Sequence, residues 1–185
     1  MKAGELREQI WSDLVRHNAA AYPLPPHGHN PNFKGARAAA KHLLKHPQLI
    51  EAKIVLIGME AALLALRGML LEAGKTIVVP HRTKSKAYWK LEGVVKAAAR
   101  IENFHLYGVA CGLEEVELAV LASVAMAHDG ARLSKGFGFG AKGVAVPTLT
   151  LGHSCMVLDS LGVEADSDIV GFATPEQLTF ISEKR

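Results

Sequence analysis

Two short runs rich in β-branched residues enclose one apolar helical segment, and this arrangement restricts the possible folds more than any other feature. The runs are AKIVLIG, residues 52–58, and TIVVP, residues 76–80, and the segment between them, residues 60–73, ends at Gly74. Strand, helix and strand at this spacing form a βαβ unit, whose two strands run parallel because the helix returns the chain across the sheet. We therefore expect an α/β fold, a layered domain with a central, mostly parallel sheet.

Further elements follow from the pattern of apolar residues outside this unit. Leu6, Ile10 and Leu14 recur at helical spacing and predict an amphipathic helix at the N-terminus. The run over 118–127 is apolar on both faces and predicts a central strand. The other expected elements are helices over 35–46 and 91–101, an irregular proline-rich segment over 22–35 in which Asn32 caps the following helix, and strands within 144–151, 155–159 and 168–174.

The bulk composition is that of one soluble globular domain. The 185 residues are 49% apolar and 21% charged and contain no long linker, so we expect a single domain over residues 1–185. No apolar run reaches the roughly 18 to 20 residues that cross a bilayer, and the charged N-terminal segment is unlike a signal peptide, so we expect a cytoplasmic protein. The net charge of +3 suits small anionic ligands, and without an RNA-binding aromatic motif it does not favour nucleic acid. The oligomeric state stays open.

A glycine-rich stretch between basic residues, RLSKGFGFGAK over 132–142, is the main candidate for a binding site. Its glycines are Gly136, Gly138 and Gly140, and its basic residues are Arg132, Lys135 and Lys142. Glycines let backbone N–H groups approach an anion, and the basic side chains supply positive charge. The spacing matches neither standard nucleotide-binding fingerprint. A phosphate site and a mobile loop with solvated lysines therefore both remain open.

Several segments, in order along the chain, resemble the 5-formyltetrahydrofolate cyclo-ligases, also called methenyltetrahydrofolate synthetases. DGARLSKGFG, residues 129–138, resembles the phosphate loop of that family. LREQIW, residues 6–11, resembles the family's first helix, whose arginine reaches ATP, and Arg7 occupies that place. Three further segments are similar to family segments: PNFKGARAAAKHL (31–43), LLEAGKTIVVPHR (70–82) and FATPEQ (172–177). The resemblance covers nearly the whole chain.

The resemblance implies a fold, a reaction and ligands. The family's α/β fold is related to sugar-phosphate isomerase and CoA-transferase folds. Its members use ATP and magnesium to activate the formyl oxygen of 5-formyltetrahydrofolate as a phosphate ester, and the N10 amine then closes the ring to give 5,10-methenyltetrahydrofolate, ADP and phosphate. Carried onto this chain, the resemblance assigns the ATP phosphates to Arg7, Arg132, Lys135, Gly136, Gly138 and Gly140. We expect the loop to face Arg7 at the carboxyl end of the strand over 118–125.

On the substrate side, Glu60 falls where the family carries a glutamate that contacts the reduced folate. A carboxylate at this place accepts hydrogen bonds from pterin N–H groups. An ordinary carboxylate facing the N-terminus of the following helix explains the residue equally well.

Two positions that carry acids in the family are apolar here. The aspartate at the end of the family's loop is replaced by Ala141, and the acid before its closing threonine by Val170. Magnesium requires oxygen ligands at defined geometry, so no metal ligand is assigned. Asp168 lies on the same face of the expected strand but about 6.6 Å away, and Asp159 and Asp166 are further candidates. Two interpretations stay open: an ATP-dependent cyclo-ligase, or a nucleotide- or folate-binding protein of the same fold with little or no catalysis.

Nine histidines raise the question of a metal site. His42 and His46 are four residues apart on the expected helix over 35–46, a spacing that can hold zinc. Lys41 and Lys45 flank them and no third ligand stands nearby, so we expect a solvated helix face instead.

Overall fold

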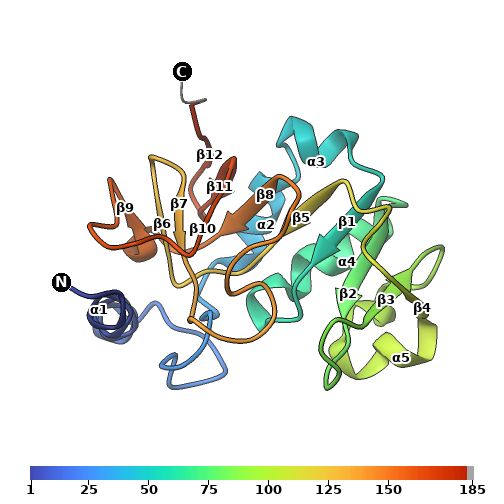
Figure 1. Cartoon of the computed structure of the whole chain (residues 1–185), viewed down its shortest axis with the longest axis horizontal. Coiled ribbons are helices and arrows are strands. Elements are labelled where there is room, and N and C mark those ends of the chain that lie inside the picture. The colour runs from blue at the N-terminus through green and yellow to red at the C-terminus, as the bar shows by residue number, and fades with distance from the viewer. Residues whose placement is uncertain (183–185) are drawn as a thin grey trace.

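A computed structural model describes residues 1–182 and shows an eight-stranded sheet at the centre of the molecule (Figure 1). Its strands are, in spatial order, β12 (Leu178–Phe180), β11 (Gly171–Ala173), β8 (Thr148–Leu151), β5 (Leu118–Val120), β1 (Ile54–Ile57), β2 (Thr76–Pro80), β3 (Tyr88–Leu91) and β4 (Val109–Cys111). The strands from β11 to β2 run parallel to one another, and β12, β3 and β4 pair antiparallel at the two edges. The predicted α/β fold with a mostly parallel central sheet is confirmed.

The βαβ unit lies at the middle of this sheet. β1 and β2 are parallel, with Val55 opposite Ile77, and α4 (Leu64–Glu72) connects them after a 3₁₀ turn over Ala61–Leu63. Gly74 has a φ of 78°, the left-handed conformation that commonly ends a helix. All residues of β2 are buried, as expected for a strand that is covered on both faces.

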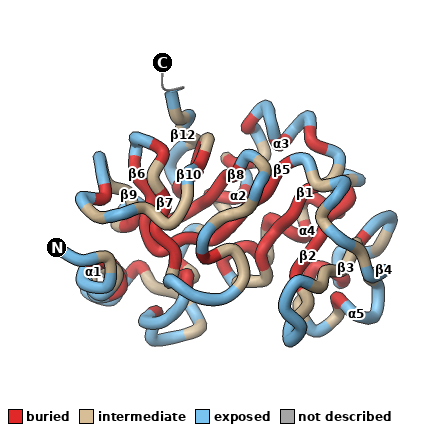
Figure 2. Tube along the Cα trace, viewed as in Figure 1, coloured by how far each residue is buried: buried red, intermediate tan, exposed pale blue. Residues whose placement is uncertain are grey.

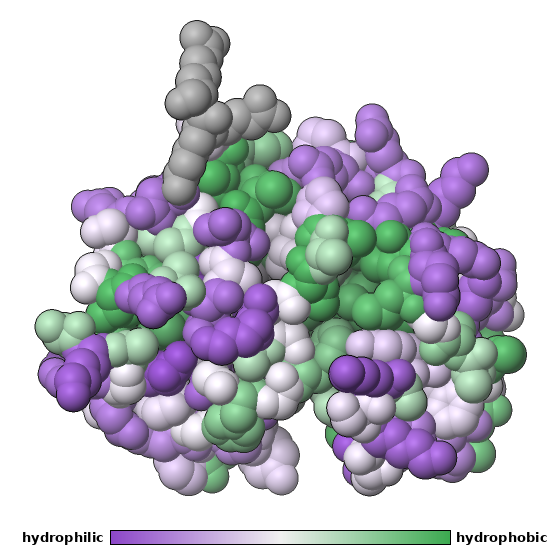
Figure 3. All heavy atoms as spheres, viewed as in Figure 1, coloured by the Kyte–Doolittle hydropathy of each residue, from purple (hydrophilic) through white to green (hydrophobic). Residues whose placement is uncertain are grey.

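The two faces of the sheet are covered differently. On one face, α2 (Ala36–Leu43) packs against β8 and β11, and α4 packs against β2. On the other face, Leu56, Val78 and Ala119 are buried under loop residues such as Phe139 and Val146. Figure 2 shows the buried strands along the middle of the molecule, and Figure 3 shows the apolar atoms gathered over them on the face that lacks helices. Helices α2 and α4 thus cover one face of the large sheet, and loop residues cover the other.

A second, four-stranded sheet carries the chain into the glycine loop. Its strands are, in spatial order, β10 (Ser167–Asp168), β7 (Ala131–Leu133), β6 (Ala125–Ala127) and β9 (Val157–Leu158). The predicted N-terminal helix, α1 (Ala3–Arg16), lies beside this sheet and buries Leu6, Ile10, Trp11 and Leu14 (Figure 1). None of the described helices has both the length and the apolar character needed to cross a membrane.

Two predicted elements are wrong in extent or type. The apolar run over 118–127 is two strands, because the chain leaves the large sheet after β5 and enters the small sheet at β6. The predicted helix over 91–101 is absent: Leu91 ends β3, Gly93 has a φ of 62°, and two 3₁₀ turns precede α5 (Phe104–Tyr107). Pairing of β3 with β2 takes Leu91 into the sheet, and the alanines that favour a helix form only the 3₁₀ turn over Lys96–Ala99. The predicted strands within 144–151, 155–159 and 168–174 are present, although the last range contains the end of β10 and all of β11.

Two local predictions also fail. Asn32 does not cap α2; Gly35, with a φ of 92°, precedes the helix, and the Asn32 Oδ1 accepts the N–H of Phe33 instead. His46 does not lie on a solvated helix face, because α2 ends at Leu43 and His46 caps the next helix, α3 (Pro47–Glu51), where it is 3% exposed.

Candidate functional site

The glycine loop, residues 134–143, lies at the carboxyl end of β5, as predicted. Gly136, Gly138 and Gly140 have φ angles of 97°, 81° and 72°. These values fall in the left-handed region, where other residues are strained, so the backbone path itself requires the alternating glycines. A Cβ atom on Gly140 would lie 3.1 Å from Leu121, which directly follows β5. The loop is thus packed against the sheet at Gly140, whereas Gly136, Phe137 and Gly138 are exposed.

Arg7 approaches the loop from α1. Its Nε donates to the carbonyl oxygen of Ser134 at 2.7 Å, and a terminal nitrogen donates to Asp166 Oδ2 at 3.1 Å. A Cβ atom on Gly136 would lie 3.2 Å from the guanidinium carbon. The prediction that Arg7 faces the loop is confirmed.

Asp166 is the acidic residue that pairs with Arg7 at the start of the loop, and its side chain is 6% exposed. Its carboxylate lies within hydrogen-bond distance of the Ser134 N–H (2.9 Å), the Ser134 hydroxyl (3.0 Å), Arg7 (3.1 Å) and Lys142 (3.1 Å). Burial acts to raise the pKa of Asp166, but these hydrogen bonds outweigh burial and lower the pKa below its ordinary value. The ionised carboxylate therefore compensates the charge of Arg7 and Lys142 and fixes the start of the loop.

Arg132 is a buried side chain that hydrogen-bonds the glycine loop. The residue is 1% exposed, and its guanidinium donates to the carbonyl oxygens of Gly140 (2.8 Å) and Ala122 (2.7 Å) and to the hydroxyls of Ser123 and Ser167 (both 3.1 Å). Burial lowers the pKa of Arg132 to about 10, against the opposing effect of nearby carboxylates, so the side chain stays charged near neutral pH. These contacts tie the loop to the end of β5 and direct the guanidinium toward protein acceptors.

Lys135 and Glu60 are joined through a third residue, Asn30. The Lys135 N–H donates to Asn30 Oδ1 at 2.8 Å, and Asn30 Nδ2 donates to Glu60 Oε2 at 2.9 Å. Asn30 is 4% exposed. The Lys135 ammonium lies 4.5 Å from the centre of the Phe137 ring, a cation–π distance. The structure thus brings the predicted phosphate and substrate residues to one place, through an asparagine that the sequence did not single out.

A cavity of about 530 Å³ opens beside the loop. Gly138 and Phe139 of the loop line it, together with Met59 and the segment 81–87 after β2. The basic residues of that segment are Arg82, Lys84 and Lys86, and no carboxylate lines the cavity within the described part of the chain. Sequence analysis missed this basic segment, although three cationic residues at alternate positions after a parallel strand were a usable signal.

The residues at this site do not fit a protein-bound magnesium ion. Ala141 is 8% exposed and Val170 connects β10 to β11, and neither side chain offers an oxygen. Asp168 pairs with Ala131 at the far end of β7 and lines a different cavity. Asp159 is exposed after β9. Within residues 1–182, no group of three His, Cys, Asp or Glu is arranged to hold a metal.

Comparisons with known proteins agree with this architecture. The NMR structure of Aquifex aeolicus 5,10-methenyltetrahydrofolate synthetase superimposes with a TM-score of 0.68 at 18% identity, covering 100% of this chain and 95% of that one, which shows a shared fold. A methenyltetrahydrofolate synthase domain-containing protein of Bos taurus is 30% identical over 177 residues, covering 84% of this chain and 47% of the relative. Its Homo sapiens counterpart is 28% identical and covers 98% of this chain and 54% of the relative.

This chain therefore spans about half the length of the relatives it matches. The sequence model of the 5-formyltetrahydrofolate cyclo-ligase family matches residues 2–170, which is most of the chain. The chain belongs to the 5-formyltetrahydrofolate cyclo-ligase family.

Proposed function

We propose that this chain binds the phosphates of a nucleotide, together with a reduced folate, in the cavity beside the glycine loop, and that its ATP-dependent cyclo-ligase turnover is slow or absent. One observation carries the proposal: the glycine loop keeps three left-handed glycines and is bonded at Ser134 by Arg7, while positions 141 and 170 offer no oxygen for a metal. The site is thus equipped to hold an anion and poorly equipped to neutralise a phosphoryl group in transfer.

Nucleotide binding rests on backbone N–H groups and on positive charge. Backbone turns that contain left-handed residues point successive N–H groups toward one concave side, which is a common way to hold phosphate. Lys135 supplies a cation at the loop, and the basic segment 81–87 lines the cavity together with Gly138 and Phe139. Arg7 adds charge that Asp166 partly compensates. We assign Arg132 to holding the loop in shape, because its hydrogen bonds go to the protein.

Folate binding rests on Glu60. Glu60 lies beside the cavity and not in its lining: it follows Met59, which does line the cavity, and its carboxylate already accepts one hydrogen bond, from Asn30. A carboxylate has about four acceptor sites, so pterin N–H groups can donate to the others. The Glu60–Asn30–Lys135 series then couples the folate side of the site to the phosphate side.

Slow turnover follows from the missing acids. Catalysis of phosphoryl transfer depends almost wholly on positioning and on electrostatic stabilisation, in which metal ions neutralise charge on the phosphates. Protein carboxylates normally fix such an ion, and Ala141 and Val170 cannot. The alternative, an active ATP-dependent cyclo-ligase, is favoured by the family match over residues 2–170.

Titration calorimetry tests the binding proposal. ATP and 5-formyltetrahydrofolate are titrated separately and together, with and without magnesium. We expect both to bind, ATP weakly, with little gain from magnesium. The Lys135→Ala variant should bind ATP more weakly. Its control, Lys45→Ala, changes an exposed lysine between α2 and α3 and should leave ATP affinity unchanged. Failure of both ligands to bind the wild-type chain would overturn the proposal.

A further inference from the structure

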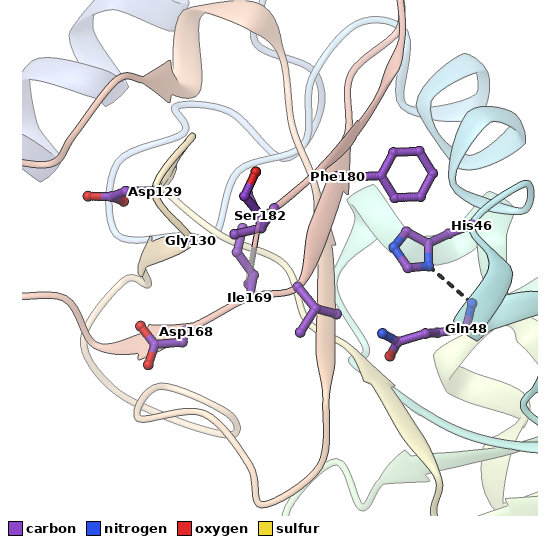
Figure 4. Close-up of a pocket in the computed structure, with 10 residues that line it drawn as sticks. His46, Gln48, Asp129, Gly130, Asp168, Ile169, Phe180 and Ser182 are labelled. Atoms are coloured by element: carbon purple, nitrogen blue, oxygen red, sulfur yellow. Dashed lines mark hydrogen bonds between the residues drawn. The ribbon is translucent and has the colours of Figure 1, made fainter. Parts of the chain in front are cut away.

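A second cavity, of about 320 Å³, lies between α3, β12 and the turn that joins β6 to β7. In Figure 4, His46 and Gln48 lie on one side of this cavity, and Asp129 and Asp168 lie on the other. The cavity is distinct from the glycine-loop site, because Asp168 pairs with the first residue of β7, whereas the loop follows the last. None of the residues that line one cavity lines the other.

The His46 side chain presents a buried hydrogen-bond donor without an acceptor. Its Nδ1 accepts the N–H of Gln48 at 3.2 Å, so the proton of the neutral ring is on Nε2. Burial lowers the pKa of His46, which keeps the ring neutral near pH 7. Nε2 has no hydrogen-bond partner among the described residues, although the residue is 3% exposed. A buried donor without an acceptor is costly and rare, so this N–H points to a missing partner.

The surroundings hold the ring in this orientation. His46 is the N-cap residue of α3 and is held there because its Nδ1 accepts the Gln48 N–H. A Cβ atom on Gly171 would lie 2.9 Å from Nε2, so glycine at that position leaves room for the ring edge. The Phe180 ring covers His46 at 5.0 Å and is itself 58% exposed, on the edge strand β12. Phe180 is therefore a cover that can turn aside without disturbing the core.

The other side of the cavity is acidic. Asp129 and Asp168 are both exposed, and no lysine or arginine lines the cavity within residues 1–182. Ile169, Val170 and Ile181 supply an apolar stretch of the wall. In a chain of net charge +3, this is a local concentration of negative charge next to apolar surface.

We propose that this cavity binds a small organic cation that also carries a hydrogen-bond acceptor. An amine or guanidine pairs with Asp129 and Asp168, a short apolar chain lies on the isoleucine and valine side chains, and a carbonyl oxygen accepts the proton of His46 Nε2 once Phe180 turns aside. A volume of about 320 Å³ is at the lower end of small-molecule sites, so the ligand is short. The site goes beyond the proposed nucleotide and folate site and does not depend on it.

Three matched probes separate the two ends of this ligand. 6-Aminohexanamide carries both the ammonium and the carbonyl, hexylamine lacks the carbonyl, and hexanamide lacks the ammonium. Each is titrated into the full chain labelled with ¹⁵N and followed by NMR. We expect 6-aminohexanamide to shift the Gly130 and Ile169 amide signals and to move the His46 Nε2–H proton downfield. It should bind about five-fold tighter than hexylamine, as one hydrogen bond implies, and about three-fold tighter than hexanamide, as one exposed ion pair implies.

Two variants complete the test. Asp168→Asn should weaken 6-aminohexanamide about three-fold and leave hexanamide unchanged. Asp159→Asn makes the same charge change at an exposed position outside the cavity and should leave both probes unchanged. Equal affinity for hexylamine and 6-aminohexanamide, an unaltered affinity in Asp168→Asn, or no shift at the cavity up to the solubility of the probes would each overturn the proposal.

Discussion

Asp166→Asn is the substitution that tests the contacts among Asp166, Arg7 and Ser134 at the start of the glycine loop most sharply. The carboxylate meets Arg7, Lys142 and both the N–H and the hydroxyl of Ser134, and its side chain is 6% exposed. Asparagine keeps nearly the same shape and keeps one acceptor oxygen for the Ser134 N–H. Its amide nitrogen, however, is a donor that faces other donors, and the charge that compensates Arg7 is lost.

The size of the effect follows from the exposure of each partner. Breaking a buried ion pair costs about 3 to 5 kcal/mol because a charge is left uncompensated. The Lys142 side chain is 80% exposed, so its loss adds little. Arg7 is 17% exposed and keeps its bond to the Ser134 carbonyl, which reduces the cost. We expect a loss of about 2 to 3 kcal/mol in the free energy of unfolding, or roughly 4 to 12 °C in Tm for a chain of this size.

The pH dependence supplies an independent test. Because the pKa of Asp166 is lowered in the folded protein, its stabilising effect is complete above the unfolded-state pKa of about 3.9. That effect is lost as the pH falls through the lower folded-state pKa. Urea unfolding at pH 7 and at successively lower pH should therefore show the gap between wild type and Asp166→Asn closing only below about pH 4. Asp168→Asn, two residues further along the chain but exposed, is the control and should stay within about 0.5 kcal/mol of wild type at pH 7. A difference in the free energy of unfolding between wild type and Asp166→Asn of under about 0.5 kcal/mol at pH 7, or one that persists in acid, would refute this role of Asp166.

Three further predictions concern the loop. Lys135→Ala should weaken ATP binding by a similar factor, about five-fold, with and without magnesium, measured by calorimetry, because it removes a cation and not a metal ligand. Ala141→Asp should make ATP affinity depend on magnesium, whereas Ala141→Asn, of equal size but uncharged, should not; equal behaviour of the two variants would contradict the assignment. Arg132→Met should lower the free energy of unfolding by about 2 to 4 kcal/mol, measured in urea, because the carbonyl oxygens of Gly140 and Ala122 lose a buried charged donor. A neutral effect of Arg132→Met would show that the loop does not need this support.

The spacing of apolar residues predicted the elements whose formation depends on neighbouring residues in the sequence. The βαβ unit and α1 follow from apolar spacing alone, and both are present. The segment over 118–127 misled because every residue in it is buried, so nothing in its hydrophobicity marks the exchange of one sheet for another. Ser123 lies between the two strands, where its hydroxyl is hydrogen-bonded to Thr150 and to the Arg132 guanidinium.

The residues of the candidate site likewise fall into those that the sequence identified and those that it did not. Its glycines and Arg7 were accessible through the family resemblance, since they lie in recognisable segments. Asp166 was named as a metal candidate without a position, and its contact with Arg7 joins residues 159 positions apart. Asn30 reaches Lys135 across 105 positions, from a proline-rich segment with no regular pattern. Such contacts depend on how the two sheets and α1 pack together, which no spacing along the chain encodes.

The central claim, a retained ligand site with little or no catalysis, is tested most directly by turnover. The full chain is incubated with 5-formyltetrahydrofolate, ATP and magnesium, and formation of 5,10-methenyltetrahydrofolate is followed by its absorbance. An active family member, such as a methenyltetrahydrofolate synthetase with both acids in place, serves as the positive control. We expect little or no product from the wild-type chain at concentrations where calorimetry detects binding. Fast, magnesium-dependent formation of the methenyl product by the unmodified chain would contradict the claim and establish an active cyclo-ligase.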